Sequence, residues 1–430
     1  MKKRTLKIMA IAMVFALIFA FAAIPASAVG SNYTAVNGGE TTFTKFMVVD
    51  ADTHIPNVTF DFSIAPIATG KPATASTVAV YAPDSAGVTG TPTISDPVFT
   101  SSATTYDSPQ HVDEGKLNLA TGKKYAKETV TVNFSNVSFP EPGIYRYVVT
   151  EAAASGAYSH DTQNTGGTAL TRYLDVYVTD KEDGTGLLVS SYVLHKNDGP
   201  VNANSNAGSS DVASDTNPVA DKSASYVNEY ATKDLGISKE VSGNQASRDK
   251  YFEYTVTIEN LVEGDTYTVD YSNADASINA NPNEATTVIT EDVTQPSTLT
   301  VAANGTSITQ KFYLQHGQSI KILGLPTTAT YTVTENKEDY TSTSGNTIEA
   351  VPASGTQGEQ GYVQARTYND PTTGNMSDDH YVGFTNTKDG VIPTGVLLTI
   401  APFAIGLLLF GALAVFFIAR KKRREGEDEE

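Results

Sequence analysis

The 430-residue sequence contains no cysteine and no tryptophan, and only six histidines. Without cysteine there is no disulfide and no thiolate metal site, so an exported protein of this size must be stabilised by its core or by another covalent bond. The histidines show no metal-ligand spacing, and we interpret His111, His160 and His195 as solvated loop or edge residues. We therefore expect no metal and no cofactor.

Basic residues are also scarce, because 29 lysines and arginines stand against 48 aspartates and glutamates, for a net charge of −19 at pH 7. Such a surface repels the phosphate backbone of nucleic acids, which excludes DNA and RNA as expected partners. No glycine-rich phosphate loop and no Ser-His-Asp pattern stands out. The composition suits a solvated extracellular protein.

Both ends of the chain carry export signals. Residues 1–28 have a basic start, an apolar run over Ile8–Ile24 and a terminal Ala-Ser-Ala, which predicts a secretory signal peptide. Residues 396–418 carry no charge and are long enough to cross a hydrocarbon core of about 30 Å as a transmembrane helix. The basic and acidic tail at 419–430 would stay cytoplasmic. We therefore expect residues 29–390 to lie outside the cell.

Directly before the apolar segment stands the sequence Val391-Ile392-Pro393-Thr394-Gly395. A Pro-Thr-Gly at this place resembles a cell-wall sorting signal of Gram-positive bacteria, in which a sortase cuts after the threonine and transfers it to an amine. The usual signal is Leu-Pro-x-Thr-Gly, whereas here no residue separates proline from threonine, as in the shorter Val-Pro-Thr-Gly signals of some pilin subunits. The alternative is a plain membrane anchor preceded by a chance Pro-Thr-Gly.

Between the two ends the pattern is that of β-strands throughout. Runs rich in Val, Thr, Tyr and Phe alternate and are separated by Gly, Pro, Asn and Asp. No amphipathic helix of ordinary length appears, and residues 69–113 and 199–220 have a loop-like composition. The runs that predict strands include Thr41–Val49, Val58–Ile64, Ile144–Thr150, Tyr173–Val178, Leu187–Val193, Ser223–Tyr230, Tyr251–Ile258, Tyr267–Tyr271, Ile308–Tyr313 and Thr330–Thr334.

The β-pattern contains an internal repeat. Residues Pro142–Glu151 align without a gap on Pro326–Glu335, and each half carries a lysine upstream and an asparagine downstream of its glutamate. The repeat predicts an all-β chain of two tandem sandwich domains, residues 29–230 and residues 231–390, each large enough for its own core.

Six polar residues of the repeat fall on the inward faces of the predicted strands, because residues two apart in a strand share a face. A buried unpaired amine or carboxylate costs several kcal/mol, or the group loses its charge. We therefore predict that these residues meet as two sets of three. The sets are Lys45, Glu151 and Asn228 in the first half, and Lys239, Glu335 and Asn386 in the second.

Such a set offers a chemical reaction. Burial favours a neutral amine and a neutral acid, so the lysine can attack the asparagine side chain while the glutamate shuttles the proton. The product is a Lys–Asn isopeptide bond and ammonia, formed once and without turnover. Two alternatives remain: a buried Lys–Glu salt bridge capped by the asparagine, or β-bulges that turn some of these residues to solvent.

The combination resembles the two-domain backbone pilins of Gram-positive bacteria, of the FctA-like type with isopeptide-containing domains. The resemblance is carried by the tyrosine-rich run ending in Glu151, by Ile237–Gly243, by Tyr331–Glu335, and by Phe384-Thr-Asn386 leading into the Pro-Thr-Gly motif. It implies immunoglobulin-like sandwiches of the Cna B type, with the lysine on the first strand, the asparagine on the last and the glutamate between.

The resemblance also implies an acceptor lysine near the end of the first domain, to which a sortase joins the threonine of another subunit. Lys222 matches it best, and Lys196 and Lys233 are alternatives. The expected partners are a sortase, copies of the chain itself and cell-wall peptidoglycan, with minor pilins and a host surface ligand as further candidates. The expected location is the cell wall, after a membrane-anchored precursor.

The leading hypothesis is therefore a structural subunit of a covalent cell-surface pilus, with no enzymatic turnover. The runner-up is a monomeric wall-anchored adhesin or minor pilin built from the same domains. A secreted hydrolase using Glu151 and Glu335 is a third possibility, but the two carboxylates fall in separate repeats and could hardly share one site.

Overall fold

A computed structural model describes residues 34–111, 116–153, 156–160, 170–202, 222–223, 225–280, 289, 291–347 and 372–390. Within these ranges every regular element is a β-strand, apart from the short 3₁₀ helix η2 (Pro83–Ala86), so the all-β prediction is confirmed. No helix of the described part is long and apolar enough to cross a membrane. Four predicted segments lie outside the described residues: the signal peptide 1–28, the motif 391–395, the transmembrane helix 396–418 and the tail 419–430.

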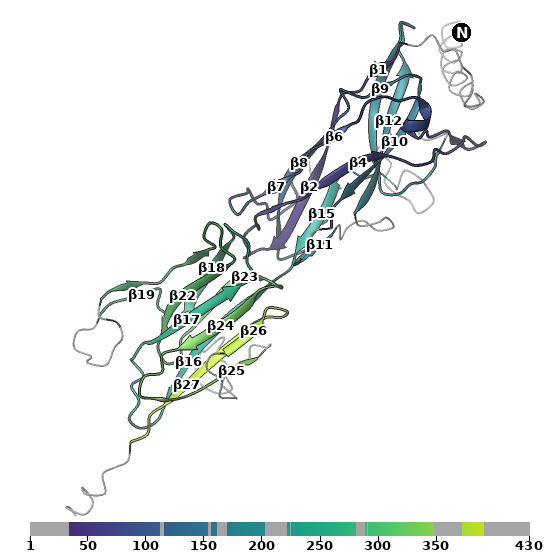
Figure 1. Ribbon diagram of the computed structural model, residues 1–430. Coiled ribbons are helices and arrows are strands. Elements are labelled where there is room, and N and C mark those ends of the chain that lie inside the picture. Colours follow the sequence, from purple (N-terminus) through teal and green to yellow (C-terminus); the bar gives the residue numbers. More distant parts are fainter. Residues whose placement is uncertain are drawn as a thin grey trace, which may run out of the picture.

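Strands β1 to β15 form the first sandwich, in which two main sheets pack face to face around one core (Figure 1). One sheet has the order β13 (Leu187–His195), β12 (Thr171–Asp180), β10 (Gly143–Glu151), β4 (Phe62–Pro66). The other has the order β11 (Tyr158–Ser159), β15 (Ser225–Tyr230), β2 (Glu40–Asp50), β8 (Lys123–Asn133), β6 (Thr93–Ile94). Short pairs flank them: β1 (Val36–Asn37) with β9 (Ser138–Phe139), β3 (Val58–Thr59) with β7 (Val98–Phe99), and β5 (Thr77–Val78) with β14 (Val201–Asn202).

Strands β16 to β27 form the second sandwich. Its larger sheet has the order β21 (Thr298–Thr300), β18 (Thr266–Asn273), β23 (Ser319–Pro326), β16 (Thr232–Ser242), β27 (His380–Thr387), β25 (Thr341–Thr347). The smaller sheet has the order β22 (Ser307–Leu314), β17 (Phe252–Glu259), β24 (Thr330–Glu335), β26 (Thr372–Asn375). A short pair, β19 (Ser277–Ile278) with β20 (Val293–Thr294), stands beside them.

Both sandwiches share one topological feature. The first long strand and the last strand lie side by side and parallel, as β2 with β15 and as β16 with β27. The strand that ends in the repeat's glutamate, β10 or β24, belongs to the opposite sheet. The last strand of the first sandwich ends at Tyr230 and the next begins at Thr232, beside the division at 230/231 that we propose.

Alternation of apolar and polar residues builds the cores. In β17, Phe252, Tyr254, Val256 and Ile258 are buried, while the residues between them face outward. Burying one such apolar side chain stabilises the fold by about 1.5–3 kcal/mol. Aromatic rings fill much of the first core, where Phe62 packs edge-on against Tyr226 with 5.1 Å between ring centroids.

The structure differs from the sequence prediction in one strand and one loop. The run expected over Val58–Ile64 is split into β3 and β4. Between these two strands the Phe60 amide donates to the Pro97 carbonyl, and the Asp61 carbonyl accepts from Ala152, so the backbone pairs with other segments here. The stretch 69–113, expected as loop, contains β5, β6, β7 and η2. Most of 199–220 lies outside the described residues.

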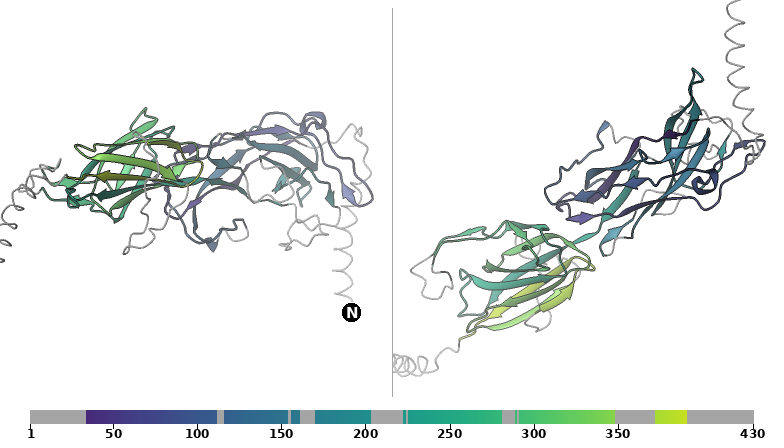
Figure 2. Two further views of the ribbon diagram at one scale, coloured as in Figure 1. Left: turned by 90° about the horizontal axis from the view of Figure 1, so that it is seen from below. Right: turned by 45° about the horizontal axis from the view of Figure 1, so that its top comes forward.

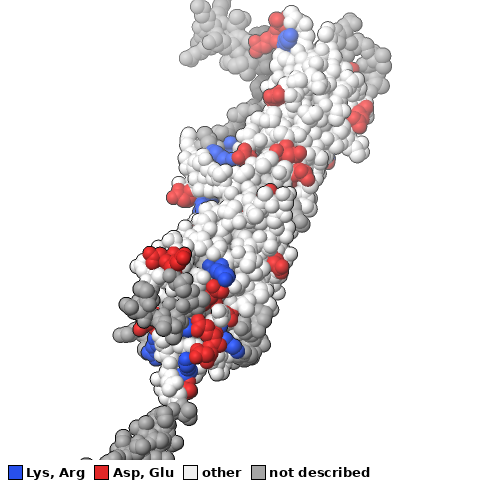
Figure 3. All heavy atoms as spheres, turned by 60° about the vertical axis from the view of Figure 1, so that its left-hand side comes forward, with Lys and Arg blue, Asp and Glu red and all other residues white. Residues whose placement is uncertain are grey.

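The two sandwiches lie end to end and give an elongated molecule in all views (Figures 1 and 2). The face seen in Figure 3 carries scattered acidic and basic side chains separated by uncharged surface. A surface of that kind presents no single dominant charged patch on this side.

The joint between the sandwiches contains a buried carboxyl group. Asp265 is 2% exposed, and its Oδ1 accepts hydrogen bonds from the backbone amide of Asn57 at 2.7 Å and from the Asn57 side chain at 3.2 Å. The Tyr267 hydroxyl donates to Oδ2 at 3.4 Å. His54 and Thr268 form another contact across the joint, with Nε2 and Oγ1 3.1 Å apart. Burial raises the pKa of Asp265, so the carboxylate's charge is costly here although its oxygens are needed as acceptors.

The joint yields a first prediction. We expect Asp265→Ala to loosen the two sandwiches, because the Asn57 donors lose their acceptor, at a cost of about 1–3 kcal/mol. Asp265→Asn keeps an oxygen acceptor and removes the buried charge, so it should retain the wild-type geometry. Small-angle X-ray scattering measures the distribution of interdomain distances, with Asp183→Ala in an exposed turn as control. Equal loosening by Ala and Asn would contradict this account.

Candidate functional site

Three fully buried polar side chains meet in the first sandwich. Nζ of Lys45, on β2, lies 2.7 Å from Oε2 of Glu151, the last residue of β10 in the opposite sheet. Nδ2 of Asn228, on β15, donates to Oε1 of the same carboxyl group. All three side chains are 0% exposed. One carboxyl group therefore bridges the amine of the first strand and the amide of the last.

The second sandwich repeats this arrangement. Nζ of Lys239, on β16, lies 2.5 Å from Oε1 of Glu335, the last residue of β24. Nδ2 of Asn386, on β27, donates to the same oxygen at 3.2 Å. The amide oxygen Oδ1 of Asn386 is buried and has no hydrogen-bond partner among the described residues. An unpaired buried oxygen is costly, and it belongs to the carbonyl group that the lysine amine would attack.

The register of the strands is the same at both sites. In the parallel pair β2–β15, Lys45 stands opposite Tyr226, and the asparagine follows two residues later. In β16–β27, Lys239 stands opposite Phe384, and the asparagine again follows two residues later. Because residues two apart share a face, each lysine and asparagine point into the same core.

Burial sets the charge state of the two amines. It lowers the pKa of Lys45 to about 8, and the nearby carboxylate of Glu151 offsets only part of that effect. It lowers the pKa of Lys239 to about 8 in the same way, with Glu335 opposing it. Aromatic rings provide the apolar wall, since the Lys45 amine lies 4.4 Å from the ring centroid of Phe60. The neutral, nucleophilic form of the amine is therefore much more populated here than at an ordinary surface lysine.

Each site can act in two ways. A neutral amine held against an amide, with a carboxyl group in contact with both, has the components for amide exchange with loss of ammonia. The same contacts also describe a buried ion pair capped by an amide. No β-bulge turns any of the six side chains to solvent, since the most exposed, Glu335, is 5% exposed. Among the described residues there is no cluster of His, Asp and Glu that could hold a metal ion.

Sequence reasoning missed two residues of the second site. Tyr254 stands opposite Glu335 in the register of β17 with β24, and its hydroxyl donates to Oε1 at 2.9 Å. The Ser342 hydroxyl donates to Oε2 at 3.1 Å. In the first sandwich the residue opposite Glu151 is Phe62, which has no hydroxyl. The alternation of β17 places Tyr254 inward, but only strand pairing identifies its partner.

Two histidines were wrongly interpreted as solvated. The side chain of His160 is only 15% exposed, and its Nδ1 lies 3.3 Å from Nδ2 of Asn228. The side chain of His195 is 12% exposed, with Nε2 3.0 Å from Oδ2 of Asp175. His160 directly follows β11 and His195 ends β13, and both strands lie at the edge of their sheets, so the expected edge position is confirmed although the side chains are more buried than composition indicates. His111 lies at the surface.

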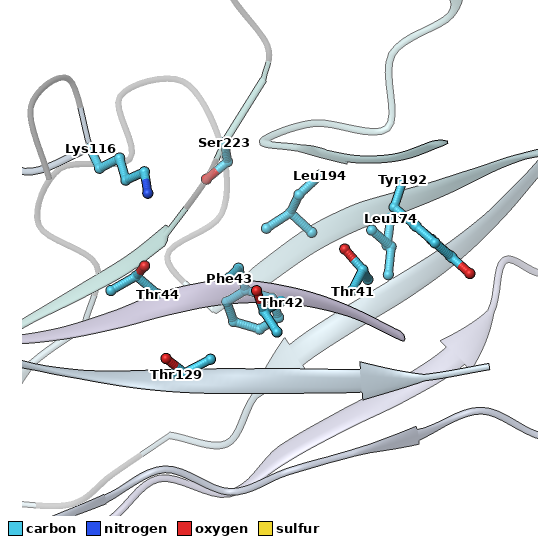
Figure 4. A pocket seen from close by; sticks show the side chains of 10 residues that line it. All are labelled: Thr41, Thr42, Phe43, Thr44, Lys116, Thr129, Leu174, Tyr192, Leu194 and Ser223. Atoms are coloured by element: carbon cyan, nitrogen blue, oxygen red, sulfur yellow. The ribbon is translucent and has the colours of Figure 1, made fainter. Parts of the chain in front are cut away.

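Lys222 is exposed, and its backbone pairs with His195 at the edge of the β13 sheet. Its neighbour Ser223 lines a pocket of about 270 Å³, together with Lys116 and side chains of β2, β12 and β13 (Figure 4). Lys196 and Lys233 are half-buried. Of the three lysines considered as acceptors, Lys222 is therefore the most accessible.

Two family models match the chain, one in each sandwich. Residues 42–231 match the family model FctA, the Spy0128-like isopeptide containing domain. Residues 233–388 match a domain of unknown function, DUF7601. The chain is 26% identical over 396 residues to a pilin of Streptococcus pyogenes serotype M1, covering 90% of this chain and 92% of that one.

Solved structures give similar matches. The major pilin from Streptococcus pyogenes is 21% identical, with a TM-score of 0.45, covering 83% of this chain and 100% of that chain. The major pilin protein T3.2 from the same species is 18% identical, with a TM-score of 0.48, covering 83% and 99%. The first sandwich therefore matches the FctA isopeptide-domain family, and the chain is similar to a streptococcal pilin over nearly the whole length of both proteins, which supports an FctA-like pilin of Gram-positive bacteria.

Proposed function

We propose that the chain is the structural subunit of a covalent pilus, in which each sandwich is closed by an isopeptide bond and the subunits are joined by a sortase. The observation that carries the proposal is the recurrence of three buried groups in the same register in both sandwiches. The match of the first sandwich to a pilin isopeptide domain and the similarity of the chain to a pilin support the structural role and disfavour turnover of a substrate.

The proposed bonds join Lys45 to Asn228 and Lys239 to Asn386. In each case the nucleophilic amine attacks the side-chain carbonyl carbon, the proton that the amine loses passes by way of the glutamate to the leaving nitrogen, and ammonia leaves. Packing holds the groups together before the reaction, so a high effective molarity replaces an external catalyst.

The location of the proposed bonds suits a pilus that is pulled along its length. Each would tie the first long strand of a sandwich to its last strand, and these strands carry the chain into and out of the domain. Force applied at the chain ends would then pass through a covalent bond instead of peeling strands from the sheet. Stability would also rise, because a crosslink restricts the unfolded chain as a disulfide does.

Polymerisation is proposed to use the sorting motif and an exposed amine. A sortase would cleave after Thr394 and transfer its carbonyl group to Lys222 of another copy, or to cell-wall peptidoglycan in the last subunit. Exposure of Lys222 at a sheet edge favours it over Lys196 and Lys233. The second candidate function, a monomeric wall-anchored adhesin or minor pilin, needs the sorting motif but no acceptor lysine.

A second prediction follows for the internal bonds. Asn228→Ala and Asn386→Ala should each leave one crosslink, and the double variant none, while both Lys–Glu pairs stay in place. Intact mass under denaturing conditions counts the ammonia lost. Each single variant should also unfold more easily, by roughly 3–5 kcal/mol for a crosslink that closes a loop of more than 100 residues.

The control is Asn375→Ala, which makes the same change at the exposed end of β26. It should keep both crosslinks. Masses that differ from wild type only by the substitution itself, in all the variants, would mean that the buried salt bridge is the correct interpretation.

A third prediction concerns polymerisation. Cells that carry Lys222→Ala should lose the high-mass ladder on denaturing gels, whereas Lys196→Ala and Lys233→Ala should keep it. Thr394→Ala should abolish both the ladder and wall attachment. An unchanged ladder in Lys222→Ala rejects this acceptor, and a wild-type cell without any ladder favours the adhesin.

A further inference from the structure

In each sandwich, the strand that carries the asparagine also pairs with a further strand on its other side. That further strand places one more polar residue beside the asparagine. β11 lies beside β15 (Figure 1) and runs antiparallel to it. Ser159 pairs with Glu229, so the next residue, His160, follows opposite Asn228. In the second sandwich, β25 runs antiparallel to β27 and pairs Ser342 with Asn386. Opposed residues of antiparallel strands have neighbouring side chains on one face. His160 and Ser342 therefore hold equivalent positions.

The two residues make different contacts. Nδ1 of His160 lies 3.3 Å from Nδ2 of Asn228 and 3.4 Å from Oε1 of Glu151. The hydroxyl of Ser342 instead donates to Oε2 of Glu335. An imidazole thus stands beside the nitrogen that must leave in the first site, whereas the second site has a hydroxyl committed to the carboxyl group.

The ring of His160 also connects the first site to its surroundings. The side chains of Lys45, Glu151 and Asn228 are fully buried, whereas that of His160 is 15% exposed. A group in contact with both the leaving nitrogen and solvent is suited to deliver a proton and to restore it afterwards.

We propose that His160 is a fourth catalytic residue of the first site, donating a proton from Nδ1 to Nδ2 of Asn228 as that nitrogen leaves as ammonia. The proposal rests on the crosslinking function proposed above. An amide nitrogen leaves readily only when it gains a proton, and general acid catalysis of such a step contributes about 10²–10⁴-fold in rate.

The atoms and charges balance over one reaction. The neutral amine of Lys45 forms a bond to Cγ of Asn228, and the bond from Cγ to Nδ2 breaks. Nζ gives one proton to the carboxylate of Glu151, and the leaving nitrogen receives one from His160. Glu151 then returns its proton to His160 across their 3.4 Å contact. One amine and one primary amide have become one secondary amide and one ammonia.

The chain contains its own control, because the second site has no imidazole at this position. We would follow both crosslinks during cell-free synthesis of residues 29–394, quench at timed intervals in denaturant, and measure the crosslinked peptides by mass spectrometry. His160→Ala should slow the Lys45–Asn228 bond by about tenfold or more and leave the Lys239–Asn386 bond at its wild-type rate.

Two further measurements separate proton donation from mere positioning. His160→Gln retains a polar, hydrogen-bonding side chain but no transferable ring proton, so it should be as slow as the alanine variant. Free imidazole should restore part of the rate in His160→Ala and should not change the Lys239–Asn386 bond. Protease protection of the first sandwich checks that each variant folds.

Several results would overturn the proposal. It fails if His160→Ala crosslinks at the wild-type rate, or if His160→Gln does so, since a positioning role would then suffice. It also fails if free imidazole has no effect on a folded His160→Ala protein. If wild-type protein forms neither crosslink, the proposed function itself falls. These outcomes are distinguishable because the wild-type chain is measured in the same series.

Discussion

The structure depends on the burial of a lysine amine, carried by one of two parallel strands, against a glutamate carboxyl of the opposite sheet. Without their partners, Lys45 and Glu151 would each cost several kcal/mol in such an apolar core. Adding Asn228 to this pair requires β2 and β15 to be neighbours, with β10 ending at the same place in the opposite sheet. The same burial that costs free energy also lowers the pKa of the Lys45 amine. A lower pKa favours the neutral amine, which is the form that can attack the asparagine.

Much of this site could be predicted from the sequence. Alternation with period two placed Lys45, Glu151 and Asn228 on inward faces, and the internal repeat placed Lys239, Glu335 and Asn386 at matching positions. The structure brings each set of three together. The fold class was also predictable, because no helical period competes with the strand pattern between residues 31 and 390.

The further contacts of the two sites could not be predicted, because they depend on strand pairing across long sequence separations. Alternation shows that Tyr254 points inward but not that Glu335 is its partner, since that follows from the register of β17 with β24. His160 directly follows a strand of two residues, which is too short to be recognised by its pattern, and its approach to Asn228 arises from the pairing of that strand with β15. The run from Val58 to Ile64 divides for the same reason, because its middle bonds to other segments.

The most direct test is the intact mass of recombinant Val29–Thr394 under denaturing conditions. The account predicts a shortfall of two ammonia masses from the sequence mass, with peptide mapping that places the bonds at Lys45–Asn228 and Lys239–Asn386. A mass equal to that of the sequence would contradict it, and would leave two buried salt bridges as the interactions that close the sandwiches.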